Sequence, residues 1–246
     1  MKLFLVDIKN KELEELNMKK KKEFKLSREE YISQLAHKSN EIHITNHNSK
    51  TGVCCNNLAF PTCTCRDDAP CKATGCYCMK GTQAMATVVA AYLRNLTIYN
   101  RDPYDFWEQV RFKIKHNPLP LFRFFDAGDI PSHEFFCGMV ELAKDFPNIK
   151  FMSFTKKYNI VNDWLKAYDK LPDNLNIIFS AWHIGWEVDN PYGMPIAYVD
   201  FTDKTLNPEF PEGITGCPNQ KDKTITCSVC QKCWNKNIKA VKFVQH

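Results

Sequence analysis

The chain has 246 residues, of which 44% are hydrophobic and 25% are charged, and its formal net charge is +5. This apolar content excludes a disordered chain and is enough to bury one substantial core. The apolar patch at residues 3–6 is interrupted by Asp7 and Lys9, which argues against a signal peptide, and no apolar run approaches the ~18 residues of a membrane span. We therefore expect no membrane association and a cytoplasmic location.

Helical and strand patterns alternate along the chain. Ser27 followed by Glu30 is a capping box, which predicts a helix over residues 27–40, and the alternating segment 41–48 predicts a strand. Further helices are expected at residues 81–96, 103–117, 133–147 and 159–171. Further strands are expected at residues 119–129, 148–157, 173–182, 194–201 and 237–246. The isolated Cys137 falls inside an apolar helical pattern, so we expect it to be buried.

Strands separated by helices of this length predict βαβ units and a parallel sheet. A complete eight-stranded barrel typically needs ~250 residues, so the predicted fold class is α/β, a partial TIM-like parallel barrel of about six strands. We divide the chain into a basic N-terminal arm and helix at residues 1–40, the barrel at residues 41–210, and a cysteine segment with a final strand at residues 211–246.

The chain contains 12 cysteines, most of them in two groups. In a reducing compartment, such groups indicate metal binding rather than disulfides. In the first group, the spacing C-x5-C-x4-C at Cys65, Cys71 and Cys76 suits a [4Fe-4S] cluster, because three thiolates leave the fourth iron open for a ligand. Cys63 and Cys78 compete for the same roles, and four of these thiolates would equally well hold a structural zinc ion.

The second group has a sharper spacing. Cys227, Cys230 and Cys233 follow the pattern C-x2-C-x2-C, which is similar to a ferredoxin-type run, and Cys217 supplies a fourth thiolate. Four thiolates complete the coordination, so this site is expected to be structural or an electron relay. An iron–sulfur cluster is favoured over zinc, which stays an alternative.

Polar residues follow several of the predicted strands. Gly128 and Asp129 end one strand, Thr155 and Lys156 end the next, and Ser180 ends a third. In parallel α/β folds the carboxyl ends of the strands meet at one edge, where reactive groups gather. We therefore expect these side chains and the first cysteine group to form one rim.

An ordered set of motifs resembles a phage-encoded family of radical-SAM-like proteins, known mainly by a gene-product number. The motifs are N-x-K-T-G, P-T-C-x-C-x5-C-x4-C-Y-x3-G, R-F-F-D-A-G-D, F-T-K-K-Y and C-P-x8-C-x2-C-x2-C-W, and they span residues 45–246. The chain lacks the usual C-x3-C-x2-C signature of radical SAM enzymes.

This resemblance implies a cluster and S-adenosylmethionine (SAM) as cofactors, with reductive SAM cleavage and hydrogen abstraction from an unknown substrate, a nucleic-acid component being one option. It also implies an electron donor such as flavodoxin or ferredoxin. Cys65, Cys71 and Cys76 would hold the cluster, and Gly128 and Asp129 would meet the methionine amino group. The residues that would line the rest of the cofactor pocket are Arg123, Thr155, Lys156 and Ser180.

A second hypothesis belongs to a different class of protein. Four consecutive lysines at residues 19–22 form a basic run, which is typical of a solvated face or of a nucleic-acid-binding arm. The alternative to the enzyme is therefore a non-catalytic, zinc-stabilised nucleic-acid-binding protein.

Overall fold

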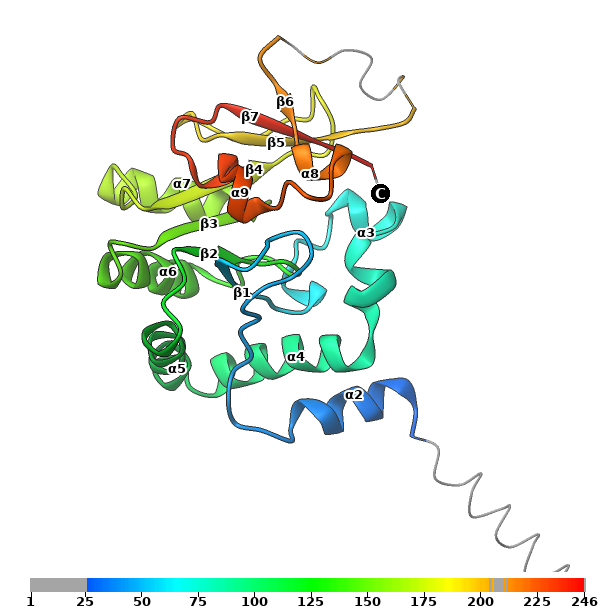
Figure 1. Cartoon of the computed structure of the whole chain (residues 1–246), viewed down its shortest axis with the longest axis vertical. Helices are drawn as coiled ribbons and strands as arrows, with labels where there is room; N and C mark the ends of the chain where they lie inside the picture. Colours follow the sequence, from blue (N-terminus) through cyan, green and yellow to red (C-terminus); the bar gives the residue numbers. More distant parts are fainter. Residues whose placement is uncertain (1–25, 204, 206–209, 211, 246) are drawn as a thin grey trace, which may run out of the picture.

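The computed structural model describes residues 26–203, 205, 210 and 212–245, so the lysine run at 19–22 lies outside the described residues. Its fold is α/β, with a seven-stranded sheet in the order β1-β2-β3-β4-β5-β7-β6 (Figure 1). All neighbouring strands are parallel. The strands are β1 (Cys55–Leu58), β2 (Leu121–Phe124), β3 (Lys150–Thr155), β4 (Leu175–Ser180), β5 (Ile196–Asp200), β6 (Thr215–Gly216) and β7 (Ala240–Val244).

The longer predicted helices are confirmed. They are α2 (Arg28–Ala36), α4 (Ala86–Arg101), α5 (Pro103–His116), α6 (His133–Asp145) and α7 (Tyr158–Tyr168). Short helices carry the cysteine segments, namely α3 (Pro70–Thr74), α8 (Pro218–Lys221), α9 (Cys227–Cys230) and the 3₁₀ helices η1 (Thr62–Thr64), η2 (Tyr77–Met79), η3 (Gly81–Ala84) and η4 (Lys232–Trp234). No helix in this described part of the chain is long and apolar enough to cross a lipid bilayer.

The prediction of a parallel α/β sheet is confirmed, whereas the sheet is not closed into a barrel. β1 to β5 follow chain order, as in successive βαβ units, and β7 then pairs with β5. The sheet has one strand more than the expected number, because the two-residue β6 pairs with β7 within the C-terminal segment.

The expected strand at residues 41–48 is wrong, and β1 (Cys55–Leu58) takes its place. In the 41–48 segment, Thr45 forms an isolated antiparallel bridge with Asn57. The side chain of Asn95, in α4, is hydrogen-bonded to the backbone of His43. Its Oδ1 accepts from His43 N at 2.7 Å, and its Nδ2 donates to His43 O at 2.9 Å. Those backbone groups are therefore not free to join the sheet.

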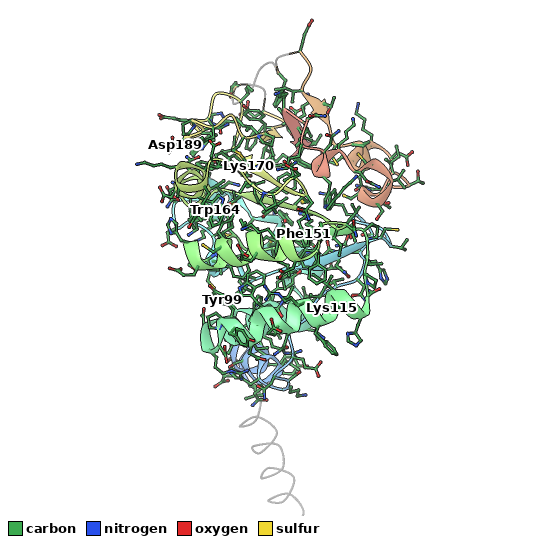
Figure 2. The ribbon with its side chains drawn as sticks, turned by 90° about the vertical axis from the view of Figure 1, so that its left-hand side faces the viewer. Tyr99, Lys115, Phe151, Trp164, Lys170 and Asp189 are labelled. Atoms are coloured by element: carbon green, nitrogen blue, oxygen red, sulfur yellow. The ribbon has the colours of Figure 1, made fainter. Side chains whose placement is uncertain are left out.

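The two faces of the sheet are covered differently. One face packs against α4 to α7 through a large aromatic core that includes Phe60, Phe106, Phe122 and Phe135. Seen from the helical side, α5, α6 and α7 stack across the sheet, with Phe151 behind them (Figure 2). The other face carries a smaller cluster that is completed by Trp234 of the C-terminal segment. The cysteine segment is thus a cover for the sheet and not a loose tail.

Cys137 is exposed on α6, which corrects the expectation that it is buried. The buried face of α6 is formed by Phe135, Phe136, Met139 and Val140. These positions make an apolar stripe of helical period, and Cys137 falls outside it.

Candidate functional site

Side chains from three strand ends meet at the carboxyl edge of the sheet. Thr155 Oγ1 donates to Asp129 Oδ1 at 2.6 Å, and Lys156 N donates to Asp129 Oδ2 at 2.9 Å. Lys156 Nζ in turn donates to Ser180 Oγ at 2.8 Å. The predicted residues Asp129, Thr155, Lys156 and Ser180 therefore form one hydrogen-bonded chain that runs from the exit of β2 across β3 to β4.

Gly128 brings the loop after β2 against the loop after β1. Its φ is +78°, and an added Cβ would lie 2.6 Å from Phe60 O and 2.7 Å from Thr64 Oγ1. The next residue, Asp129, donates its backbone N–H to Thr64 Oγ1 at 2.9 Å. The absence of a side chain at Gly128 lets the first cysteine loop approach the strand ends.

The Asp129 carboxylate is buried and held by its own chain. Besides Thr155 and Lys156, the backbone N–H of Ile130 donates to it, at 2.8 Å. Burial raises the pKa of Asp129, and the hydrogen bonds from Thr155, Lys156 and Ile130 oppose this rise. Asp129 thus fixes the end of β3 and the position of Lys156.

The first predicted cysteine trio lies beside this chain of residues. Interaction with the neighbouring thiol of Cys76, together with burial, raises the pKa of Cys71. Burial raises the pKa of the Cys65 thiol to about 12, with further contributions from Asp129, Cys71 and Cys76, while Lys156 lowers it. The three thiols are therefore close enough to interact electrostatically with one another and with the rim.

The two competing cysteines of the first group differ in placement. Cys78 is 7% exposed, and its thiol donates to Asp126 O at 3.7 Å. A hydrogen bond with Cys76 lowers the pKa of Cys78. Cys63 is exposed. Cys78 is thus a buried neighbour of the trio and the stronger rival ligand of the two.

The four C-terminal cysteines share one small cavity. Cys217 precedes α8, Cys227 and Cys230 bound α9, and Cys233 lies in η4. All four line a cavity of about 20 Å³. A space of this size holds about one water molecule or ion. Burial raises the pKa of Cys233 to about 12 and also raises that of Cys227.

The loop before β1 holds the C-terminal cysteines in place. Cys227 N donates to Lys50 O at 2.8 Å, and Ser228 N donates to Thr51 O at 2.9 Å. The start of α9 is therefore attached to a segment that lies 177 residues away along the chain. This attachment was not predicted, although the loop belongs to the quoted motif N-x-K-T-G.

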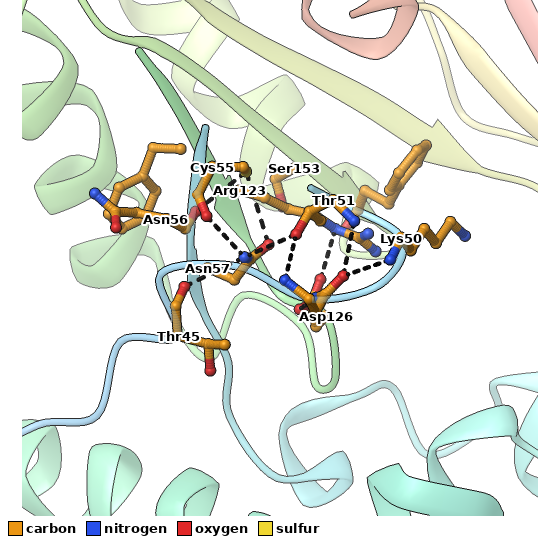
Figure 3. Close-up of polar contacts among 12 residues, drawn as sticks. Thr45, Lys50, Thr51, Cys55, Asn56, Asn57, Arg123, Asp126 and Ser153 are labelled. Atoms are coloured by element: carbon orange, nitrogen blue, oxygen red, sulfur yellow. Dashed lines mark hydrogen bonds and ion pairs between the residues drawn. The ribbon is translucent and has the colours of Figure 1, made fainter. Parts of the chain in front are cut away.

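Arg123, the remaining predicted pocket residue, lies beside Asp126 and is not part of that hydrogen-bonded chain (Figure 3). Its Nε is 3.0 Å from Asp126 Oδ1, and both side chains are 10% exposed. The two atoms attract each other as an ion pair but are not aligned as a hydrogen bond. The positive charge of Arg123 acts to lower the pKa of Cys227 and Cys233 in the C-terminal group and of Cys78 in the first group. Arg123 therefore lies between the two cysteine groups.

Asn48 and Asp126 complete this buried connection, and no role was predicted for either residue. Asn48 Nδ2 donates to Asp126 Oδ2 at 3.0 Å, and Asn48 Oδ1 accepts from the backbone N–H groups of Lys50 and Thr51. Asp126 O also accepts from the hydroxyl of Tyr77. Asn48 therefore fixes the loop before β1, to which the start of α9 is hydrogen-bonded, and also contacts the Arg123–Asp126 pair.

The donor chemistry of both cysteine groups fits a thiophilic metal. Partly buried thiols near one another are the ligands that iron–sulfur clusters and zinc prefer. Among the residues that the structure describes, no three cysteine, histidine or carboxylate side chains converge as a ready metal site. Metal binding would draw the thiols together and release their protons.

A comparison with protein-family models matches residues 10–236 to the family Gene product 88. The chain therefore belongs to this phage-type gene product family, which confirms the coarser part of the resemblance. The match shows no similarity to radical SAM proteins. Searches of curated proteins and of solved structures return no match.

Proposed function

We propose that this member of the Gene product 88 family is a radical SAM-like iron–sulfur enzyme. The observation that supports this proposal is the position of the partly buried thiols of Cys65, Cys71 and Cys76 beside Asp129 and Lys156 at the carboxyl edge of a parallel sheet. That edge is where parallel α/β enzymes place their reactive groups. We also propose that the open sheet is curved like part of a TIM barrel.

In this proposal, Cys65, Cys71 and Cys76 hold a [4Fe-4S] cluster and leave one iron open. With one electron from a flavodoxin or ferredoxin, the cluster supplies the reduction that splits SAM into methionine and a deoxyadenosyl group, which leaves as 5′-deoxyadenosine with a hydrogen atom from the substrate. The chain's own part is placement: Gly128 admits the cysteine loop, Asp129 fixes Lys156, and Lys156 brings a positive charge next to the thiolates.

The C-terminal site is proposed to be closed and not catalytic. Four thiolates from Cys217, Cys227, Cys230 and Cys233 would complete the coordination of a bound metal. The cavity of about 20 Å³ that they line favours a single zinc ion. A second [4Fe-4S] cluster, acting as an electron relay, is the alternative occupant.

Metal content is the first test of this function. Protein purified without oxygen is expected to be brown, with roughly four iron atoms per chain if the C-terminal site holds zinc and roughly eight if both sites are cubanes. Cys71→Ala or Cys76→Ala should remove the SAM-responsive electron paramagnetic resonance signal. Cys137→Ala is the matched control, because Cys137 is exposed and isolated on α6 and its loss should leave the iron content unchanged. Colourless protein that carries only zinc would end the radical proposal.

Replacing Asp129 tests whether its carboxylate binds SAM or only supports the structure. A carboxylate that meets the methionine ammonium makes a charge-assisted hydrogen bond of about 1.5–3 kcal/mol, so Asp129→Ala should weaken SAM binding about 10-fold to 100-fold. The same variant leaves the three donors of Thr155, Lys156 and Ile130 without a partner, which should cost about 2 kcal/mol or more of stability.

SAM titration of the reduced protein and denaturant unfolding measure the two effects separately. Asp163→Ala, on α7, is the control for loss of a carboxylate, since its side chain is 62% exposed. Lower stability with unchanged SAM affinity would make Asp129 a structural residue only.

The second candidate is a zinc-stabilised nucleic-acid-binding protein. It is favoured by the basic C-terminal segment, in which residues 217–246 contain six lysines and one aspartate. Zinc without iron, together with no spectral response to SAM, is the result that would select it.

A further inference from the structure

A cleft of about 420 Å³ opens beside the C-terminal cysteines. Its lining contains three lysines, two amide side chains, one cysteine and one tryptophan, and it contains no carboxylate. The residues are Lys150, Cys230, Gln231, Lys232, Trp234, Asn235 and Lys236. Lys150 opens β3, whereas Lys156 follows β3, so the cleft lies at the opposite end of that strand from the rim described above.

The floor of the cleft is tied to the sheet. Trp234 is 6% exposed, and its Nε1 donates to Phe122 O of β2 at 3.2 Å. Asn176 of β4 donates from Nδ2 to Cys233 O at 2.8 Å and to Asn235 O at 3.4 Å. These contacts fix the backbone around Lys232 and Lys236, so the two lysine side chains extend from a rigid support.

Gln231 is held in an unusual conformation at the same place. Its φ is +50°, in the left-handed region that non-glycine residues rarely adopt. Its Nε2 donates to Ser228 O at 3.1 Å, and its Oε1 accepts from Lys150 Nζ at 3.4 Å. The Gln231 side chain therefore connects the C-terminal segment to Lys150 at the start of β3 and holds the Lys150 ammonium group at the cleft.

The C-terminal segment, which supplies two of the three cleft lysines, is basic. The excess of lysine in residues 217–246 equals the formal net charge of the whole chain, +5. Among the described residues, no carboxylate lies within ion-pair distance of the three cleft lysines, and Asp173 acts on Lys236 from farther away. Three ammonium groups left without counter-ions in a cleft make a site for a multiply charged anion.

We propose that this cleft binds phosphate groups, and that their source is the backbone of a nucleic-acid strand. Lysine ammonium groups contact phosphate oxygens as point charges, and the amides of Gln231 and Asn235 add donors that are neutral. Backbone phosphates are spaced along a strand, so three ammonium groups around one cleft can contact more than one of them. The site does not depend on whether the cysteines hold iron or zinc, nor on the radical chemistry.

Binding of labelled oligonucleotides, single-stranded and double-stranded, to the full-length protein tests the proposal. Lys232→Glu/Lys236→Glu should weaken binding of the single strand roughly tenfold or more and reduce the slope of log affinity against log salt by about 1.4, at about 0.7 per lost phosphate contact. Lys166→Glu/Lys170→Glu, on and after α7, makes the same change in net charge on the helical side, where Lys170 is labelled in Figure 2, and should leave most of the affinity in place.

Pyrophosphate in the same titration distinguishes the two sources of phosphate. Loss of pyrophosphate and oligonucleotide binding in the cleft variant alone supports the proposal, whereas pyrophosphate binding without oligonucleotide binding keeps the phosphate site and overturns the nucleic-acid source. If the glutamate variant does not fold, as judged by circular dichroism, Lys232→Gln/Lys236→Gln replaces it. Equal losses in the cleft and α7 variants, or binding of neither probe by the wild-type protein, would overturn the site.

Discussion

Gly128 shows how much can depend on one missing side chain. Its φ of +78° disfavours any L residue, and the Cβ of an alanine would lie 2.6 Å from Phe60 O. Gly128→Ala should therefore lower the free energy of unfolding by about 2 kcal/mol or more, because the left-handed conformation alone costs about 1–2 kcal/mol and the backbone must also move. Denaturant unfolding measures this loss.

Gly185→Ala is the matched control for that variant. Gly185 has a similar φ of +80°, but nothing lies within 4 Å of its Cβ position. The control should show the cost of the conformation, about 1–2 kcal/mol, without the collision. Equal losses in the two variants would mean that the approach to Phe60 has no energetic importance.

Residues at the rim were predictable because they directly follow apolar strands. Asp129, Thr155, Lys156 and Ser180 come where a buried run ends, and parallel strand ends meet at one edge. The contact of Arg123 with Asp126 was not predictable in the same way. It depends on Asn48, far away in the chain, and no local pattern reports that approach.

At the scale of elements, the capping box of α2 is confirmed. Ser27 Oγ accepts from Glu30 N at 3.2 Å, and Glu30 Oε2 accepts from Ser27 N at 2.7 Å. The hydrogen bonds from the backbone and the hydroxyl of Ser27 lower the pKa of Glu30 below 4.5. Since the folded pKa is depressed, this contribution to stability is complete above the unfolded pKa and is lost as the pH falls through the folded value.

Loss of the box should loosen α2 at acidic pH. Backbone amide chemical shifts of residues 28–36 are expected to move toward coil values below pH 4.5 in the wild-type protein. Glu30→Gln keeps a capping acceptor that does not titrate in this range, so it should remove that step. A step that persists unchanged in the variant would assign it to another group.

The one misplaced strand has a physical explanation. β1 reads Cys-Asn-Asn-Leu, which lacks the β-branched run expected of a buried parallel strand. Its side-chain amides instead donate to partners inside the protein: Asn56 Nδ2 donates to Asn117 O at 3.0 Å, and Asn57 Nδ2 donates to Thr51 Oγ1 at 3.2 Å. Periodicity cannot report such partners, because they belong to other segments.

For the whole molecule, the order of helices and strands predicted the parallel sheet but not what covers its second face. The helices that cover the first face could be predicted from their periodic apolar residues. The second cover is the cysteine segment, whose sequence is polar apart from Trp234 and a few other residues. Its attachment through Lys50 and Thr51 could be predicted only from contacts between residues 177 positions apart.

The buried Arg123–Asp126 pair, which lies between the two cysteine groups, offers the sharpest test of this arrangement. Arg123→Met should cost about 3–5 kcal/mol, because it leaves the Asp126 carboxylate buried without its counter-charge. The double variant Arg123→Met/Asp126→Asn should lose less than the single variant, since no uncompensated charge remains. For comparison, Lys144→Met breaks an ion pair with Glu141 in which both side chains are more than half exposed, and it should cost at most about 1 kcal/mol. Urea unfolding of these three variants, of Asp126→Asn and of the wild-type protein gives the coupling energy of the pair. A double variant less stable than Arg123→Met would show that the loss does not come from an uncompensated charge on Asp126.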